Sequence, residues 1–279
     1  MKDKYSVTYL CKVAEVARSS YYKWKKSQEY PSKRKLENEI LEIVIKNIYN
    51  NYGGTYGVKR MCLCVNREVP FRVNHKRVYR IMKDLGVKSI IRNQNYKGKS
   101  WAERISANVL NREFSAEKPL EKLCMDITQI NIEDKKIYLN AIKDIFNNQI
   151  IAYDIAEEDG FPLVKKTLLK LFKMPLAENC ILHTDQGFQY TERKYCDMLK
   201  RRGIVQSMSR RGNCWDNVPI EIFFGHLKTE LIYLLNGKLS CNEICRRIED
   251  YIDFYNNERI QTKLEGMSPV EYRKKIVGI

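Results

Sequence analysis

The chain has 279 residues, with 50 Lys and Arg against 34 Asp and Glu, and a formal charge of +16. Hydrophobic residues make up 44% and charged residues 30%, which excludes a disordered chain and allows two domains. The apolar runs are too short to span a bilayer, and the N-terminus lacks the apolar core of a signal peptide. Nine cysteines without a secretion signal predict reduced thiols in the cytosol.

The positive charge is concentrated in the first part of the chain. Residues 1–118 contain 26 basic and 11 acidic residues, whereas residues 119–279 contain 24 and 23. An excess of this kind favours a polyanionic partner for the first part. The second part has the balance of an ordinary globular domain.

Residues 1–50 are expected to form an N-terminal helical segment resembling a helix-turn-helix. The pattern predicts a helix over about 8–16 and another starting near residue 21, with Ser19 or Ser20 as its N-cap. A third, amphipathic helix should end before Tyr52. Its apolar residues recur at helical spacing: Leu36, Ile40, Ile43, Val44 and Ile48.

Residues 51–90 are expected to form a helix-turn-helix that binds DNA. A helix from about Val58 to Arg67 precedes one that Asn74 caps and Gly86 ends. Apolar residues of the second helix face a core, and its long basic side chains are left on the outer face: Lys76, Arg77, Arg80 and Lys83. Such a face can reach a DNA groove. A solvated basic helix is the alternative, but two helix pairs in so basic a segment favour DNA.

Residues 91–118 lack apolar periodicity and are expected to form a basic linker. It either follows a DNA backbone or serves as a plain tether. Residues 119–279 should form an α/β domain. Apolar runs at 123–130, 137–142 and 149–155 predict a three-strand meander, and a helix follows Gly160 and Pro162. A short strand over 180–185 and further helices complete a mixed sheet covered by helices.

Two aspartates in apolar strands suggest a metal site. Asp126 lies inside the first strand and Asp185 ends a later one, and a buried carboxylate must be paired, neutral or metal-bound. Glu221 starts a predicted helix that Asn217 caps. Lys228 lies two turns further on, on the same side of that helix. A carboxylate and a lysine in this arrangement fit a metal ligand beside a phosphate contact; taken alone, they also fit an amphipathic surface helix.

The acids and the segments around them resemble the second-reading-frame transposases of bacterial insertion sequences, in the retroviral-integrase superfamily. Thirty-five residues separate Asp185 from Glu221, as in the D, D, 35, E signature of that superfamily. The other matching segments are Tyr56-Gly57, Arg72 to Val78, Asp126-Ile127-Thr128, His183-Thr184-Asp185-Gln186-Gly187, Gly212-Asn213-Cys214-Trp215-Asp216-Asn217, Glu221 to Glu230, Tyr255-Asn256-Asn257-Glu258-Arg259 and Ser268-Pro269-Val270-Glu271-Tyr272.

The resemblance implies a ribonuclease-H-like integrase core that cuts and joins DNA strands at element ends. Two divalent ions, Mg²⁺ or Mn²⁺, would be held by Asp126, Asp185 and Glu221, with Asp126 shared and no covalent protein–DNA intermediate. Lys228 would contact a phosphate, and Arg210 and Arg211 would also bind DNA. The implied partners are double-stranded DNA (element ends and target), further copies of the chain and an upstream-frame DNA-binding protein. The implied location is the bacterial cytoplasm, at the nucleoid and away from membranes.

Some residues depart from the family pattern. Leu123 and Gln129 stand where the family often has aromatic residues, and Ile222 stands where it has a small polar one. A catalytically weak regulator that binds ends without cutting, or a subunit active only when fused to an upstream-frame product, is therefore the alternative. A general ribonuclease-H-type nuclease is disfavoured by the basic helix pairs. The spacing of Cys and His residues does not fit a structural zinc.

The remaining features are assigned to structure. A structural or ligand-orienting role is expected for His183 in preference to a catalytic one. Ser240 and Glu243 form a capping box that predicts a long helix on the core. Beyond this helix, Arg259 and Lys263 are assigned either to DNA contact or to solvated charge.

Overall fold

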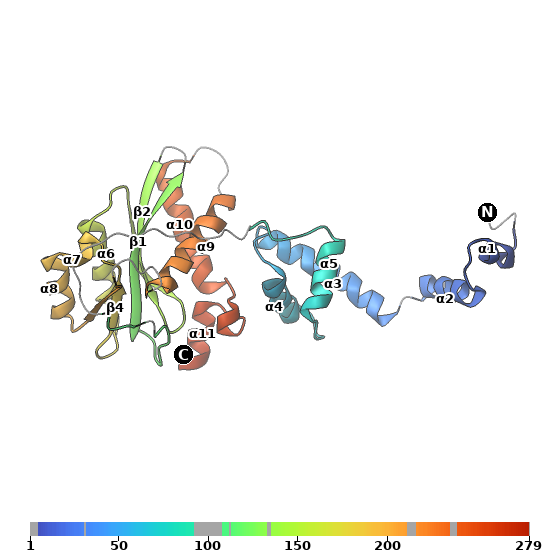
Figure 1. Ribbon diagram of the computed structural model, residues 1–279, viewed down its shortest axis with the longest axis horizontal. Coiled ribbons are helices and arrows are strands. Elements are labelled where there is room, and N and C mark those ends of the chain that lie inside the picture. The colour runs from blue at the N-terminus through green and yellow to red at the C-terminus, as the bar shows by residue number, and fades with distance from the viewer. Residues whose placement is uncertain are drawn as a thin grey trace. The chain divides into compact units, whose positions relative to one another are not determined.

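The computed structural model describes residues 5–30, 32–91, 108–111, 113–132, 135–210, 216–234 and 239–278. The chain divides into two compact units, Met1–Ile90 and Ile91–Ile279, which are described separately below (Figure 1). All eight cysteines in the described part are free. None of the described helices is long and apolar enough to cross a membrane.

The first unit is entirely helical. Its helices are α1 (Val7–Val13), α2 (Arg18–Glu29), α3 (Lys33–Asn51), α4 (Val58–Glu68) and α5 (His75–Asp84). The C-terminal half of α3 packs on α4 and α5 through fully buried residues, among them Leu41, Ile45, Met61, Val65 and Val78. The basic helix predicted in this region is α5, and its buried apolar face packs it against the other helices.

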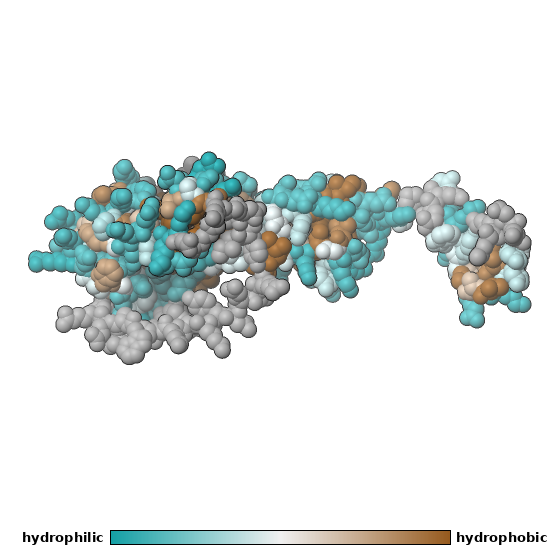
Figure 2. Space-filling view, turned by 90° about the horizontal axis from the view of Figure 1, so that it is seen from above, coloured by the Kyte–Doolittle hydropathy of each residue, from teal (hydrophilic) through white to brown (hydrophobic). Residues whose placement is uncertain are grey.

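The ends of these helices test the predicted caps. Asn74 caps α5 by accepting a hydrogen bond from the backbone N–H of Arg77, and Gly86 follows α5 with a φ of +69°. Both predictions are confirmed. The predicted cap of α2 is wrong, since α2 starts at Arg18 after Ala17. Residues of α1 and α2, including Tyr21 and Trp24, line an open apolar groove of about 460 Å³. Figure 2 shows apolar surface on these two helices.

The second unit is built on a five-stranded mixed sheet. Its strands are β1 (Lys122–Ile132), β2 (Lys135–Asp144), β3 (Ile150–Ala156), β4 (Ile181–Thr184) and β5 (Val205–Met208), in the order β3-β2-β1-β4-β5. The predicted meander is confirmed, because β1, β2 and β3 pair antiparallel. β4 and β5 extend the sheet by parallel pairing, and β5 was not predicted.

Helices cover both faces of this sheet (Figure 1). They are α6 (Phe161–Leu171), α7 (Phe188–Thr191), α8 (Arg193–Arg201), α9 (Val218–Leu234), α10 (Cys241–Asn257) and α11 (Pro269–Val277), with a short 3-10 helix, η2 (Thr262–Leu264), between the last two. One apolar core joins the sheet to α9 and α10, and the other joins it to α6, α7 and α8. The predicted fold class, a mixed sheet flanked by helices and preceded by an all-helical region, is confirmed. The capping box of Ser240 and Glu243 is also present.

Candidate active site

Asp126 and Asp185 lie side by side at the centre of the sheet. The parallel pairing of β1 with β4 places Cys124 opposite His183. Continuing this register by two residues brings Asp126 level with Asp185, which follows the last residue of β4. Adjacent strands lie about 5 Å apart, so the two carboxylates are close neighbours.

Glu221 reaches the same region from the first turn of α9. Side chains alternate along β1, so Asp126 shares the face of Cys124, which belongs to the core beneath α9 and α10. The start of α9 is tied to the sheet by buried Lys143 of β2, whose Nζ donates to the carbonyl oxygen of Pro219 at 2.8 Å. This bond fixes the end of the helix that carries Glu221.

The three carboxylates interact electrostatically. Burial raises the pKa of Asp126 well above its ordinary value, and the charges of Asp185 and Glu221 raise it further, whereas the Ile127 N–H and Lys228 act the other way. Burial, followed by the charge of Asp185, also raises the pKa of Glu221. Asp126 and Glu221 therefore resist ionisation beside Asp185, and a nearby cation would relieve this repulsion.

Asp185 and Lys228 complete the electrostatics of the site. Although Asp185 is exposed, the surrounding protein reduces the hydration of its carboxylate and raises its pKa, while the N–H of Gly187 lowers it. Partial burial lowers the pKa of Lys228, and the charge of Asp126 raises it. An ammonium near the carboxylates can contact a phosphate that approaches them.

The donor set fits hard divalent cations. The acids offer carboxylate oxygens, the ligands that Mg²⁺ and Mn²⁺ prefer, and the raised pKa values of Asp126 and Glu221 reflect burial first and neighbouring negative charge second. Within the described ranges, no three Asp, Glu, His or Cys side chains already converge tightly enough to hold one ion. The carboxylates are gathered in one region, and their side chains must turn inward to share an ion.

The turn after β4 is closely packed around a glycine. The N–H of Gly187 donates to Oδ1 of Asp185 at 2.9 Å. A Cβ added to Gly187 would lie 2.7 Å from Nε2 of Gln189 and 3.0 Å from Oδ1 of Asp185. Any larger residue must therefore displace the aspartate or the glutamine.

Gly187→Ala is expected to lower metal-dependent activity roughly 10- to 100-fold, the usual cost of disturbing a group that orients a metal ligand. Gly225→Ala on α9 is the matched control, because a Cβ there meets nothing within 4 Å and alanine favours a helix. Steady-state cleavage rates with Mg²⁺ check this. Equal rates for the two variants would contradict the role of the turn.

His183 is a buried neutral residue. Its Nδ1 lies 2.8 Å from Oγ of Ser207, and its Nε2 lies 3.1 Å from Oγ of Ser209. Burial lowers its pKa to about 4, against an opposing effect of Asp216. At neutral pH the imidazole is therefore uncharged, and it joins the ends of β4 and β5 through hydrogen bonds.

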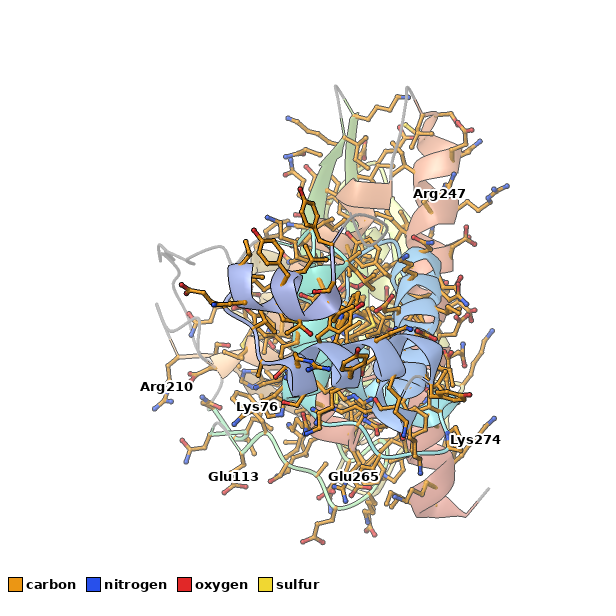
Figure 3. All side chains as sticks on the ribbon, turned by 90° about the vertical axis from the view of Figure 1, so that its right-hand side faces the viewer. Lys76, Glu113, Arg210, Arg247, Glu265 and Lys274 are labelled. Atoms are coloured by element: carbon orange, nitrogen blue, oxygen red, sulfur yellow. The ribbon has the colours of Figure 1, made fainter. Side chains whose placement is uncertain are left out.

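Asp216 was named from the sequence only as part of a matching segment, without a role, and it organises one edge of the site. It is fully buried and accepts hydrogen bonds from the backbone N–H and guanidinium of Arg210 and from Nδ2 of Asn108. Arg210, expected to bind DNA and labelled in Figure 3, thus has its half-exposed guanidinium paired with this carboxylate at 3.0 Å. Arg211 lies outside the described residues.

In the helical unit, three of the four expected DNA contacts lie exposed on α5: Lys76 (labelled in Figure 3), Arg80 and Lys83. Arg77 departs from this expectation. Its guanidinium turns back onto α3, where it donates to Glu37 at 2.8 Å and to Asn38 at 2.9 and 2.7 Å. A carboxylate and an amide on the neighbouring helix hold it, so Arg77 fastens α5 to α3.

Arg259 corrects a further expectation. Neither of its suggested roles, DNA contact or solvated charge, is right, because the side chain is 1% exposed. It donates from Nε and Nη2 to the two carboxylate oxygens of Glu230 on α9, at 2.9 and 2.6 Å. Lys263 remains exposed.

Comparison with known proteins agrees with this arrangement. Two models described as integrase core domain match residues 116–214 and 221–277, and one described as HTH-like domain matches residues 35–95. A chain of the simian T-cell lymphotropic virus intasome, in complex with PP2A regulatory subunit B56 gamma, has a similar fold. Its TM-score is 0.50 at 12% identity, over 82% of this chain and 74% of that chain. The fold and these matches define the class, a protein with an integrase core and an HTH-like domain.

Proteins of similar sequence define the family more narrowly than these domain matches do. The chain is 37% identical over 277 residues to a protein of Escherichia coli K12 named as transposase InsK for insertion sequence element IS150, covering 99% of this chain and 96% of the relative. It is 43% identical over 205 residues to a transposase-like protein of Haemophilus influenzae, covering 72% of this chain and 94% of that one. This chain belongs to the family of insertion-sequence transposases.

Proposed function

We propose that this chain is a DNA transposase that cuts DNA at the ends of its insertion sequence and joins the freed ends to a target. The observation that carries the proposal is the grouping of three acids near the end of β4, where the charge of Asp185 raises the pKa of Asp126 and of Glu221, and the charge of Glu221 raises that of Asp126. Carboxylates held in mutual repulsion are typical of sites that bind divalent cations.

The three acids would hold two Mg²⁺ or Mn²⁺ ions, with Asp126 shared. When bound, such ions supply Lewis-acid activation of the phosphate and of the attacking oxygen. Lys228 orients the DNA through a phosphate. Water attacks the phosphorus in line, the P–O3′ bond breaks, and the 3′-oxygen leaves as a hydroxyl. That hydroxyl then attacks a phosphodiester of the target strand in the same way, which frees a 3′-hydroxyl of the target.

The rest of the chain would bring DNA to these acids. Residues 1–50 and 51–90 would bind element ends, residues 91–118 would link them to the catalytic region, and residues 119–279 would carry out the chemistry. Strand cleavage at two ends calls for more than one copy of the chain, and an upstream-frame DNA-binding protein is a further proposed partner. The protein would act in the bacterial cytoplasm at the nucleoid.

The proposal is tested by incubating the purified chain with DNA from the ends of its insertion element and Mn²⁺. The wild type should release 3′-hydroxyl ends and join them to target DNA, whereas Asp185→Asn should bind the same DNA without cutting it. If both proteins bind and neither cuts, the chain alone is a regulator of transposition, or it needs an upstream fusion partner. The proposal for the isolated chain then fails.

DNA affinity should depend steeply on salt through α5. Replacing Lys76, Arg80 and Lys83 by Gln is expected to reduce the slope of log affinity against log salt by about 2 to 3, since each phosphate contact contributes about 0.9. The control removes three other exposed lysines on or just after α6, Lys165, Lys166 and Lys173. Fluorescence anisotropy from 50 to 200 mM salt checks this. Equal slopes for both variants would exclude α5 as a phosphate-binding helix.

A further inference from the structure

A buried ion pair joins the helix that carries Glu221 to the end of the next helix. Glu230 of α9 and Arg259, two residues beyond α10, are 2% and 1% exposed. Glu230 accepts two hydrogen bonds from the guanidinium of Arg259 and a third, at 2.8 Å, from the hydroxyl of Tyr251. The guanidinium also lies over the ring of Tyr255, at 5.5 Å. These hydrogen bonds tie the carboxylate of Glu230 on α9 to Tyr251 of α10 and to Arg259 just beyond it.

The pair lies on the side of α9 away from the catalytic acids. Glu230 follows Glu221 by nine residues, which at 100° per residue is half a turn of helix. Glu221 and Lys228 lie seven residues apart and share the other side. This geometry agrees with burial, since Glu230 is enclosed whereas Glu221 and Lys228 are only partly buried. Any rotation of α9 that moves Glu230 moves Glu221 in the opposite direction.

Apolar packing alone does not fix this rotation as well as the ion pair does. Phe223 and Leu227 of α9 pack on α10 through contacts that are non-directional, and a small rotation replaces one such contact by another. A guanidinium that meets a carboxylate through two parallel hydrogen bonds has one favourable geometry. Buried ionic groups have their best-attested role in setting the register of packed helices.

We propose that Glu230 and Arg259 are positioning residues, which fix the rotation of α9 and thereby direct Glu221 toward Asp126 and Asp185. This inference rests on the proposed metal-dependent function and assigns it two residues outside the acid cluster. It also assigns Arg259 to holding the catalytic helix rather than to DNA contact.

The test separates positioning from stability. Replacing both partners by Met removes both charges and keeps apolar volume, a change that is often neutral or stabilising for the fold. The double variant Glu230→Met/Arg259→Met is therefore expected to unfold at or above the urea concentration of the wild type. It should nevertheless bind Mn²⁺ about tenfold or more weakly by calorimetry, and its kcat for cleavage should fall while its KM for DNA stays unchanged.

The matched control is Glu265→Met/Lys275→Met, which removes an ion pair of 2.7 Å whose side chains are 64% and 57% exposed. This control should keep the Mn²⁺ affinity and kcat of the wild type. The inference would be overturned if Glu230→Met/Arg259→Met had the Mn²⁺ affinity and the kcat of the wild type. If the double-Met variant does not fold, Arg259→Lys provides the test, because it keeps the positive charge but cannot make two parallel hydrogen bonds to the carboxylate. This variant should also bind Mn²⁺ more weakly than the wild type. Mn²⁺ binding equal to that of the wild type would overturn the inference.

Hydrogen exchange tests the inference separately from the proposed function. Amides of α9 should exchange faster in the double-Met variant than in the wild type at equal global stability, because the helix is no longer held in one rotation. If the wild type neither binds Mn²⁺ nor cuts DNA, the proposed function fails, and this readout still decides the positioning role. Unchanged exchange in α9 would overturn it.

Discussion

Asp126→Asn is expected to abolish metal-dependent strand cleavage and, at the same time, to raise the unfolding temperature of the metal-free protein. Cleavage should fall at least about a thousandfold, because a metal ligand contributes several kcal/mol to the transition state and 1.36 kcal/mol is a factor of ten. The gain in stability has a different cause. Burial and two neighbouring acids raise the pKa of Asp126 in the fold, so its ionised form costs free energy that Asn avoids.

The pH dependence follows from the direction of that shift. An acid whose pKa is raised on folding destabilises the fold fully above its folded pKa, and the cost disappears as the pH falls below the unfolded value, near 3.8. The stability difference between variant and wild type should therefore be present at pH 7.5 and vanish at pH 3.5. Thermal unfolding with and without Mn²⁺ measures it, and Mn²⁺ should stabilise only the wild type. The control, Asp197→Asn at an exposed site on α8, should change neither quantity; a lower unfolding temperature for Asp126→Asn would contradict the account.

Arg259→Met alone should lower the free energy of unfolding by about 3 to 5 kcal/mol, because it leaves the carboxylate of Glu230 buried without the guanidinium that balances its charge. Burial by itself would raise the pKa of Glu230, and the guanidinium lowers it below its ordinary value of 4.5. In the wild type this pair therefore contributes stability at neutral pH that is lost as the pH falls through the lowered pKa.

Without the guanidinium, burial dominates, so the cost of the substitution should shrink on acidification as Glu230 takes up a proton. Urea unfolding at pH 7.5 and pH 4 measures both effects. Lys275→Met is the matched control. It breaks an equally short but exposed pair and should cost about 0 to 1 kcal/mol. If the two variants lost similar free energies of unfolding at pH 7.5, burial would not make the Arg259–Glu230 pair more important for stability than an exposed pair.

The strands and helices with strong local patterns were predictable from the sequence. β1, β2 and β3 are apolar runs bounded by turns, and α5 has both a cap and a stop residue. β5 was missed because Val205–Met208 is only four residues long and alternates weakly; its pairing with β4 holds it in the sheet. Elements that depend on a distant neighbour leave little local signal.

The acids could be named from sequence through a motif, but their meeting could not be derived from it. Asp126 and Asp185 are neighbours because β4 pairs with β1, and strand order is a property of the whole chain. The sequence also could not predict which basic residues are exposed to solvent. Arg77 and Arg259 read as surface charges, yet their carboxylate partners lie 40 and 29 residues away. A basic residue looks the same in sequence whether it faces solvent or a buried acid.

The central claim is that Asp126, Asp185 and Glu221 together hold the divalent ions used to cut and join DNA. The most direct measurement is a calorimetric titration of Mn²⁺ into the protein bound to DNA from its element ends. The wild type is predicted to bind two ions per active site, and Asp126→Asn/Asp185→Asn/Glu221→Gln to bind none there while retaining DNA. The same number of ions bound with the same affinity by both proteins would contradict the claim.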